Sequence, residues 1–303
     1  MKIARYWARA TLDGVTGEHG TFDLAVRRGS NRSPEHAMRL AKQAVEDLAK
    51  RVRSGEDLDW YDYAEAGKPE PVVQEWGRNL WEENEQTLAA VTINRYGCKV
   101  LNTKSLVFID VDFGEDAAPT VGGVFGRLFG KKNKLENKVD LALAKLELWV
   151  AEGSGRGARA YRTAAGLRYL LVNPPMEPDS DEALDLMDDL GADDLYSDLC
   201  MYQQCFRARL TPKPWRMPVG RPPFPIGVDE QGKVAPAQEW RRTDADVAAL
   251  QRWMERYELE SQRFGVCAPV AEYGDLTPRS ELDQELIDLH DAETRAFEGL
   301  ALA

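Results

Sequence analysis

Two aspartates separated by one residue end the most hydrophobic predicted strand of the chain. Asp110 and Asp112 stand in the segment LVFIDVDFGE, residues 106–115. Residues two apart in a strand project from the same face, which places the two carboxylates roughly 6 to 7 Å apart. Such carboxylates repel each other unless a cation or a shared proton lies between them. Mg²⁺ or Mn²⁺, held by one or two carboxylates together with phosphate oxygens, is the usual solution. The pattern therefore predicts a divalent-metal site, and the alternative is a strand end at which both aspartates are solvated or one of them caps the following loop.

Four arginines on two later predicted strands suit the phosphate that such a metal would share. Two flank a predicted hairpin turn at AAG in RAYRTAAGLRYLL, and two stand at alternate positions of CFRARL, where they share one face. A guanidinium group binds phosphate through paired hydrogen bonds. The predicted phosphate-binding residues are Arg162, Arg168, Arg207 and Arg209. If these strands lie beside Asp110, metal and arginines converge on one polyphosphate; alternatively, the arginines pair with the acidic segment 177–198.

Three other features carry weaker chemical signals. The segment TVGGVFGRLFGKKNK has glycines that offer backbone N–H groups to phosphate, but it lacks the GK[ST] ending of a P-loop, so a surface loop is expected. His290 and Asp291 are neighbours on a predicted helix, an arrangement common on solvated helix faces. Cys200 and Cys205 form a zinc site only if folding brings His290 to them; otherwise the four cysteines are reduced, partly buried thiols.

The overall composition is that of a globular protein with an acidic charge balance. The chain has 303 residues, of which 43% are hydrophobic, enough to bury a sizeable core. Its 39 Lys and Arg residues against 51 Asp and Glu residues give a formal net charge of -12, which excludes an overall electrostatic drive toward nucleic acid or anionic membrane. Any polyanion must bind to a local patch. The start has no apolar signal segment, and no run of about 18 apolar residues occurs, so a cytoplasmic protein with no membrane partner is expected.

The periodicity along the chain predicts an α+β fold. Strands are expected at 3–11 and 21–27, and two or three more within 88–113, before the hairpin and the CFRARL strand. Helices are expected between and after these strands; the first begins at Pro34, with Ser33 as its N-cap. The order favours an antiparallel or mixed sheet, a palm with helices packed on one face, followed by two C-terminal helices.

Three regions are expected to pack as one compact unit. Residues 1–87 form an N-terminal α/β subregion, and residues 88–216 form the palm-like core. Residues 217–303 contain a proline-rich connection, extended because proline cannot continue a helix, and then the two C-terminal helices.

Longer stretches of the chain carry two resemblances. The strings NRYGCKVLNTKSLVFIDVD, RAYRTAAGLRYLL, CFRARLTPKPWR and LHDAETRAF resemble a family of uncharacterised bacterial proteins over most of the chain, which implies a shared fold. More distantly, residues 88–215 resemble the RRM-like catalytic palm of the archaeo-eukaryotic primase superfamily. In that superfamily a D-x-D pair binds divalent metal, a later small-x-His motif binds the nucleotide phosphate, and a third acidic residue completes the metal site.

Asp110 and Asp112 match the first of these motifs. RAYRTAAGLR departs from the second, because it offers Arg162, Thr163 and Arg168 where histidine is expected, and CFRARL departs from the third, because it carries arginines and no acid. The resemblance implies metal-dependent binding of a nucleotide or single-stranded nucleic acid, with Mg²⁺ or Mn²⁺, by a divergent nucleotidyltransferase or an inactive relative. The other hypothesis is a non-enzymatic protein whose aromatic N-terminal segment and C-terminal helices bind a protein partner.

Overall fold

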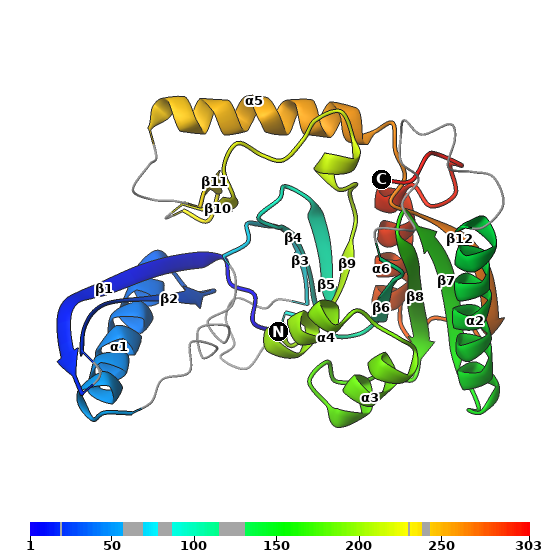
Figure 1. Cartoon of the computed structure of the whole chain (residues 1–303), viewed down its shortest axis with the longest axis horizontal. Helices are drawn as coiled ribbons and strands as arrows, with labels where there is room; N and C mark the ends of the chain where they lie inside the picture. The colour runs from blue at the N-terminus through cyan, green and yellow to red at the C-terminus, as the bar shows by residue number, and fades with distance from the viewer. Residues whose placement is uncertain (19, 57–68, 78–86, 115–130, 230, 238–242) are drawn as a thin grey trace.

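The computed structural model describes residues 1–18, 20–56, 69–77, 87–114, 131–229, 231–237 and 243–303. Its helices and antiparallel strands confirm the predicted α+β class (Figure 1). The predicted glycine-rich loop lies, apart from its ends, outside the described residues. Among the helices of the described ranges, none is both long enough and apolar enough to cross a membrane.

The N-terminal residues form a small module with its own apolar core, at the left in Figure 1. Its elements are strands β1 (Tyr6–Gly17) and β2 (Gly20–Ser30), which pair antiparallel, and helix α1 (Pro34–Arg53). The predicted N-cap is confirmed, since the Ser33 hydroxyl accepts a hydrogen bond from His36 N at 3.2 Å. Both strands are longer than predicted, and β1 continues through the expected turn by means of a bulge between Leu12 and Val15.

Two four-stranded antiparallel sheets form the rest of the fold. The β5 sheet has the strand order β3-β4-β5-β9, and the β8 sheet has the order β12-β7-β8-β6. Their strands are β3 (Val72–Trp76), β4 (Ala89–Ile93), β5 (Lys99–Thr103), β6 (Val107–Asp112), β7 (Gly157–Thr163), β8 (Gly166–Asn173), β9 (Phe206–Arg209) and β12 (Cys267–Gly274). The predicted hairpin with its turn at AAG is confirmed as β7–β8. Pairing of β3 with β4 and of β12 with β7 joins residues of all three predicted regions.

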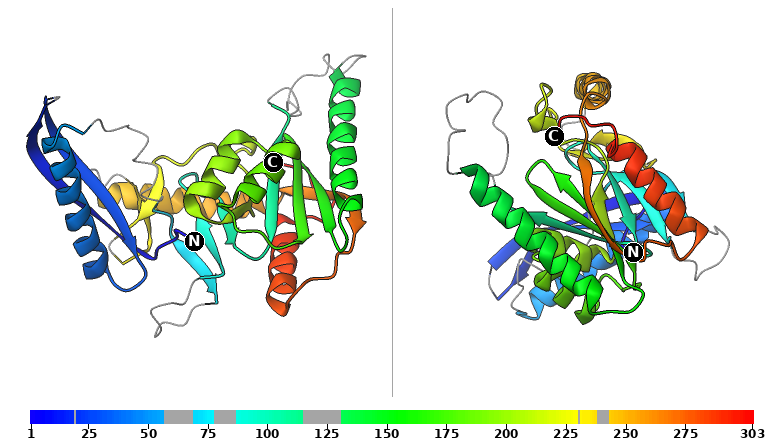
Figure 2. Two further views of the ribbon diagram at one scale, coloured as in Figure 1. Left: turned by 90° about the horizontal axis from the view of Figure 1, so that it is seen from below. Right: turned by 90° about the vertical axis from the view of Figure 1, so that its right-hand side faces the viewer.

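The β8 sheet is covered by helices on both faces, whereas the sequence predicted helices on one face. The remaining helices are α2 (Lys131–Ala151), α3 (Asp181–Asp189), α4 (Asp194–Gln203), α5 (Asp244–Ser261) and α6 (Glu281–Thr294). Neighbouring residues of β8 point to opposite faces: the Tyr169 hydroxyl donates to Ala142 O of α2 at 3.2 Å, while Arg168 contacts His290 of α6. The two helices lie on opposite sides of the sheet in Figure 2. Because β8 is buried along both faces, both must be covered.

Three local predictions differ from the structure. The sequence pattern predicts a helical acidic segment, and the structure divides it into two helices, because Gly191 takes a left-handed conformation (φ +74°) between α3 and α4. The apolar pattern of KLENKVDLALAKLELWVAEG predicts that Leu141 and Leu148 of α2 point inward, but they are 63% and 60% exposed. The buried stripe of this helix instead runs through Ala142, Leu146 and Val150, which are four residues apart. The connection between α5 and α6 contains strand β12, which the sequence pattern did not predict.

The remaining elements are short. The 3₁₀-helix η3 (Pro214–Arg216) precedes the proline-rich connection, and a small hairpin of β10 (Ile226–Val228) and β11 (Val234–Pro236) follows η3. All four cysteines are free and buried.

Gly166 sets how closely β6 and β8 approach at the end of the β8 sheet. It faces Asp112 in the strand register, and a Cβ atom built on it would collide with the Val111 carbonyl group. Glycine is required at this position because a larger residue would not fit beside Val111. A hydrogen bond from Phe113 N to Ala165 O, 3.0 Å long, holds the same two segments together.

We expect Gly166→Ala to lower the free energy of unfolding by about 1–3 kcal/mol, the usual cost of overpacking. Urea denaturation should give a lower midpoint with an unchanged slope. Gly265→Ala is the matched control, because its nearest atom is the flexible Leu302 Cδ2 at 3.4 Å, and its effect should stay within about 0.5 kcal/mol. Equal effects of the two substitutions would show that the β6–β8 approach is not tight.

Candidate functional site

Asp110 and Arg168 face each other across β6 and β8 and form a two-point ion pair. Arg168 Nε donates to Asp110 Oδ1 at 2.7 Å, and Nη2 donates to Oδ2 at 3.1 Å. The Arg168 side chain is fully buried, whereas the Asp110 side chain is 32% exposed. Burial by itself would raise the pKa of Asp110, but the charge and hydrogen bonds of Arg168 outweigh it and hold that pKa below its ordinary value. Asp110 is therefore ionised at neutral pH, and Arg168 compensates its charge.

The third nitrogen of Arg168 links the two sheets to α6. Nη1 donates to the carbonyl oxygen of Arg209 in β9 at 2.8 Å and lies 3.4 Å from His290 Nε2. Strands β6 and β9 are edge strands of different sheets, so Arg168 connects the sheets where their edges meet.

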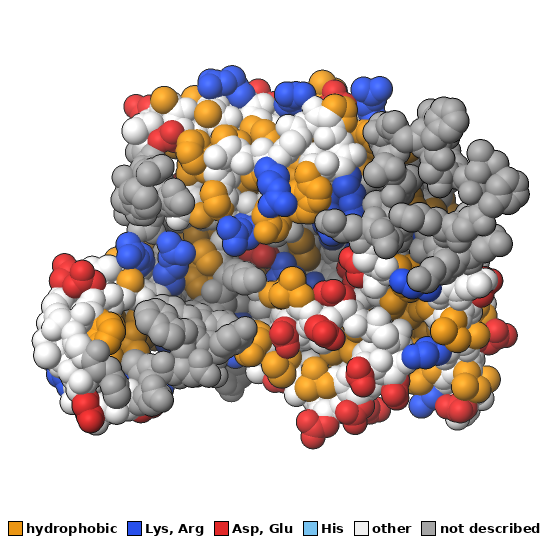
Figure 3. Space-filling view, viewed as in Figure 1, with side chains coloured by type: hydrophobic (Ala, Val, Ile, Leu, Met, Phe, Trp, Pro, Cys, Tyr) orange, Lys and Arg blue, Asp and Glu red, His pale blue; other side chains and the backbone are white. Residues whose placement is uncertain are grey.

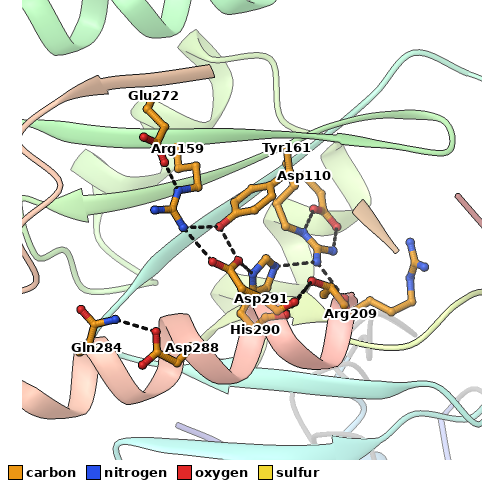
Figure 4. A network of polar contacts seen from close by, with 11 residues as sticks. Asp110, Arg159, Tyr161, Arg209, Glu272, Gln284, Asp288, His290 and Asp291 are labelled. Carbon is orange, nitrogen blue, oxygen red and sulfur yellow. Dashed lines mark hydrogen bonds and ion pairs between the residues drawn. The ribbon is translucent and has the colours of Figure 1, made fainter. Parts of the chain in front are cut away.

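His290 and Asp291 belong to this buried network, so the prediction of a solvated helix face was wrong (Figure 4). Asp291 accepts hydrogen bonds from the Tyr161 hydroxyl at 2.6 Å and from Arg159 Nη1 at 2.8 Å. His290 Nδ1 lies 3.0 Å from the same carboxylate. With Nδ1 donating to Asp291, Nε2 is free to accept from Arg168, and burial lowers the pKa of His290, so the ring is neutral at pH 7. The network holds α6 against β7 and β8.

A small cleft with a volume of about 120 Å³ opens beside Asp110. Its walls are the end of β6, the β7–β8 turn, the start of α4 and the chain that follows β9. Pockets that enclose a drug-sized ligand measure roughly 300–1,000 Å³, so this cleft accommodates one phosphate-sized group rather than a whole nucleotide. Its charged lining residues are Asp110, Asp112, Asp193, Arg209, Lys213 and Arg216.

The three cations of the cleft have no ionic partner in the part of the chain that the structure describes. Arg209, Lys213 and Arg216 form no ion pair with any residue in the described part of the chain, and Arg209 Nη1 is buried without a hydrogen-bond partner. Burial, together with repulsion from Arg209 and Arg216, lowers the pKa of Lys213 to about 8, although Asp112 and Asp110 oppose this shift. Burial and the charge of Arg209 also lower the pKa of Arg216. An anion in the cleft would bond to Arg209 and relieve the repulsion among the three cations.

The carboxylates of the cleft each accept hydrogen bonds from neighbouring donors. Besides the ion pair of Asp110, Asp112 Oδ1 accepts from Gly114 N at 2.8 Å, and Asp193 Oδ1 accepts from Tyr196 N at 3.0 Å. Each carboxylate keeps lone pairs for a further ligand. Within the described ranges, however, no group of three or more His, Cys, Asp or Glu side chains is arranged to hold a metal ion. A metal here would therefore need phosphate oxygens and water to complete its coordination, as Mg²⁺ often does.

The structure brings part of the predicted arginine set to the cleft. Arg209 lines the cleft, and Arg168 fixes Asp110 beside it. Arg207 is buried against the β5 sheet, where its Nη2 lies 3.0 Å from both carboxylate oxygens of Glu70. Arg162 donates to a carbonyl oxygen at the start of β8 at 3.0 Å and does not line the cleft. Among the described residues, none of the four forms an ion pair with the acidic segment that was the predicted alternative.

No sequence pattern predicts Asp193 at the site, and the predicted phosphate-binding set does not include Lys213 or Arg216. Asp193 reaches the cleft because its backbone N–H donates to Asp110 O at 3.0 Å. For the two cations a signal existed: they follow Arg209 closely in RLTPKPWR, where two prolines prevent the strand from continuing. A chain that turns at a strand end keeps its next residues near that end.

A larger hollow, with a volume of about 760 Å³, lies along α5, β11 and the C-terminal segment. Leu250, Met254 and Tyr257 of α5 form an apolar wall, and on another side Glu293 is paired with Lys99 at 3.0 Å. None of the predicted site residues lines this hollow. The protein-binding surface predicted for the C-terminal helices stays a prediction.

Scans against protein-family models, curated proteins and solved structures found no match for this chain. The resemblances to a bacterial family and to the primase palm therefore stay predictions. Function has to be inferred from the geometry and charge of the site.

We expect Asp110→Asn to lower the free energy of unfolding by roughly 3 kcal/mol, because it leaves the buried Arg168 without a compensating charge. The value is at the low end for a broken buried pair, since Asp110 is partly exposed. Asp112→Asn is the matched control; this side chain is exposed, and its loss should change the free energy by less than about 1 kcal/mol in urea denaturation.

The destabilisation by Asp110→Asn should depend on pH. Because the pKa of Asp110 is lower in the folded protein, the ionised carboxylate stabilises the fold above the ordinary pKa of 3.8. That stabilisation is lost as the pH falls through the lower, folded-state pKa. The difference between wild type and variant should be constant from about pH 8 to 5 and shrink below about pH 4. A difference that stays unchanged at lower pH would contradict the ion pair as its source.

Proposed function

We propose that the cleft binds a phosphate group of a nucleotide or of a nucleic acid. The observation that carries this proposal is Nη1 of Arg209, which is buried and has no hydrogen-bond partner among the described residues, in a cleft that Lys213 and Arg216 also line. Buried donors are nearly always hydrogen-bonded in folded proteins, to protein groups or to ordered water, and an oxygen of a ligand in the cleft would supply such an acceptor. Phosphate oxygens form strong, charge-assisted hydrogen bonds with guanidinium and ammonium groups.

The number of cations favours phosphate over a carboxylate ligand. A terminal phosphate group carries up to two negative charges and three acceptor oxygens, against one charge and two non-bridging oxygens in a phosphodiester, so one terminal group can contact Arg209, Lys213 and Arg216 together. A carboxylate has one charge and two oxygens and would leave part of the repulsion in place. The small volume of the cleft agrees with a single phosphate whose remaining substituents lie outside.

A divalent metal is the second part of this proposal. Asp110 and Asp112 line the same cleft as the cations, and Mg²⁺ or Mn²⁺ beside them would offset the repulsion between these carboxylates and a bound phosphate. Asp112 is the principal candidate ligand, because the charge of Asp110 already compensates Arg168. Nucleotidyl transfer stays a prediction that rests on the primase resemblance.

We expect Arg209→Gln and Lys213→Ala each to weaken the binding of pyrophosphate about tenfold or more, since each removes a hydrogen bond to a charged ligand. Isothermal titration measures the dissociation constant directly. Lys42→Ala, an exposed lysine of α1, is the control and should leave it unchanged. Unchanged binding by folded Arg209→Gln would refute a phosphate site in the cleft.

Phosphate affinity should fall as the pH rises from about 7 to 9. The pKa of Lys213 is about 8, so the free lysine loses its charge in this range. A bound phosphate favours the charged form, which means that binding takes up a proton. Adenosine monophosphate is a suitable ligand, because its phosphate is fully ionised above about pH 7. Lys213→Arg keeps the charge and should bind equally at both ends of the range; the same decline in that variant would assign the pH dependence to another group.

Mn²⁺ should strengthen the binding of ATP to the wild type, and Asp112→Asn should abolish that gain while it retains metal-free binding of phosphate. Arg209→Gln should weaken binding with and without the metal. Asp112 is preferred to Asp110 for this test because its replacement leaves Arg168 paired. If Mn²⁺ does not change the affinity of the wild type, the metal is removed from the proposal and the phosphate site remains.

A further inference from the structure

An aromatic and cationic surface adjoins the cleft, and the phosphate site does not account for it. Tyr96 in the β4–β5 turn and Trp215 in η3 meet edge to face, with ring centroids 5.2 Å apart and an interplanar angle of 80°. The Arg221 guanidinium lies 4.7 Å from the Trp215 centroid and 5.7 Å from the Tyr96 centroid. Trp215 is 38% exposed, and Arg221 is also exposed. We call Tyr96, Trp215 and Arg221 the Trp215 platform.

Local structure holds the rings of the platform in place. Asn94 Oδ1 accepts hydrogen bonds from Tyr96 N at 2.9 Å and from Cys98 N at 3.1 Å, which fixes the turn that carries Tyr96. Trp215 follows the buried Pro214 in η3, and its edge-to-face contact fixes the orientation of its ring. A surface ordered in this way loses little conformational entropy when a ligand binds.

Lys213 joins the Trp215 platform to the cleft. Its Nζ lies 5.8 Å from the Trp215 centroid, and the same residue lines the cleft. Arg95 adds another cation, 5.4 Å from the Tyr96 centroid. Cationic and hydrophobic side chains also lie side by side below α5 on the face shown in Figure 3. The surface therefore combines ring faces with positive charges, the two features that single-strand binders use.

We propose that this surface binds single-stranded nucleic acid, with one phosphate in the cleft and a neighbouring base stacked on the Trp215 platform. The inference rests on the proposed phosphate site and extends it from a single phosphate to a strand. A duplex is not expected, because its bases are stacked on one another and cannot lie flat on an exposed ring.

The energies favour a base over the arginine that now covers the rings. An exposed cation–π contact is worth about 0.5–1 kcal/mol, whereas stacking of a base on an aromatic side chain is worth about 1–3 kcal/mol. A base can therefore replace Arg221 over Trp215. The displaced guanidinium group of Arg221 can then bind a phosphate of the same nucleic acid, so it still contributes to binding.

The charges around the cleft indicate on which side of the cleft the nucleic acid continues. One rim is formed by the start of α4, and acidic residues such as Asp181, Glu182, Asp193 and Asp194 begin α3 and α4 or precede them. Figure 3 shows acidic side chains gathered over these helices, at the lower right. The other rim carries Lys213 and Arg216 and leads to the platform. A polyanion that enters the cleft is repelled on the α4 side and attracted toward Trp215.

The test is fluorescence anisotropy with the full chain and a labelled oligothymidylate of about 12 nucleotides, near the site size of a single-strand binding module. We expect Trp215→Ala to weaken binding about tenfold and Trp215→Phe to restore most of it. Phe297→Ala is the matched control, because Phe297 is an exposed ring with an arginine 6.0 Å from its centroid, and it should bind as the wild type does.

Salt dependence separates stacking from phosphate contacts. Arg221→Ala and Lys213→Ala should each reduce the slope of log affinity against log salt by about 0.7, the value for one phosphate contact on a single strand. Trp215→Ala should lower affinity without changing the slope. An abasic oligonucleotide should bind the wild type as weakly as oligothymidylate binds Trp215→Ala.

Three outcomes would overturn the inference. Equal affinity for the abasic strand, equal affinity for a duplex of the same length, or unchanged binding by folded Trp215→Ala would each exclude a base on the platform. Titration of the same proteins with pyrophosphate tests the phosphate site separately from the base-binding platform. Trp215→Ala should bind pyrophosphate as the wild type does. If neither pyrophosphate nor the oligonucleotide binds to the wild type, both proposals fall together.

Discussion

Arg168 carries a positive charge in the fully buried centre of the fold, and the junction of the two sheets is built around the compensation of that charge. A buried guanidinium group destabilises a fold by several kcal/mol unless it is paired and its N–H groups are bonded. Asp110 supplies the opposite charge from β6, the carbonyl group of Arg209 accepts from β9, and His290 accepts from α6. A shift of any of these elements would leave a buried donor unbonded, so their relative positions are closely defined.

The cations that lie near β9 and the cleft fall into two groups according to that requirement. Arg168 and Arg207 are buried, and each has a carboxylate partner within the fold. Arg209, Lys213 and Arg216 converge on one cleft and have no such partner among the described residues. Their mutual repulsion reduces the stability of the free protein, and a ligand that binds only the folded state returns that stability by mass action. Such a local conflict between charge and burial is typical of a functional site.

The sequence predicted the local parts of this site and missed the parts that depend on tertiary packing. Alternation along the strands and the turn at AAG correctly placed Asp110 on a strand and Arg168 on a hairpin arm. Strand geometry predicts the same role for Arg207 and Arg209. In the structure Arg207 is bonded to Glu70 and Arg209 lines the cleft, because their surroundings come from distant segments of the chain. The sequence likewise did not predict that His290 is buried. Which face of α6 is buried depends on how this helix packs over β8, and that is a tertiary contact.

The net charge of -12 bears on how a nucleic acid could bind to such a surface. The field of the whole protein repels a polyanion, and screening limits the attraction of the cleft to roughly 8 Å at physiological ionic strength. Electrostatic steering from a distance is therefore weak, and affinity has to come from groups in direct contact with the strand. Salt weakens the phosphate contacts among these but leaves base stacking largely unaffected. At physiological salt the rings of the Trp215 platform would then contribute a larger share of the binding free energy than they do at low salt.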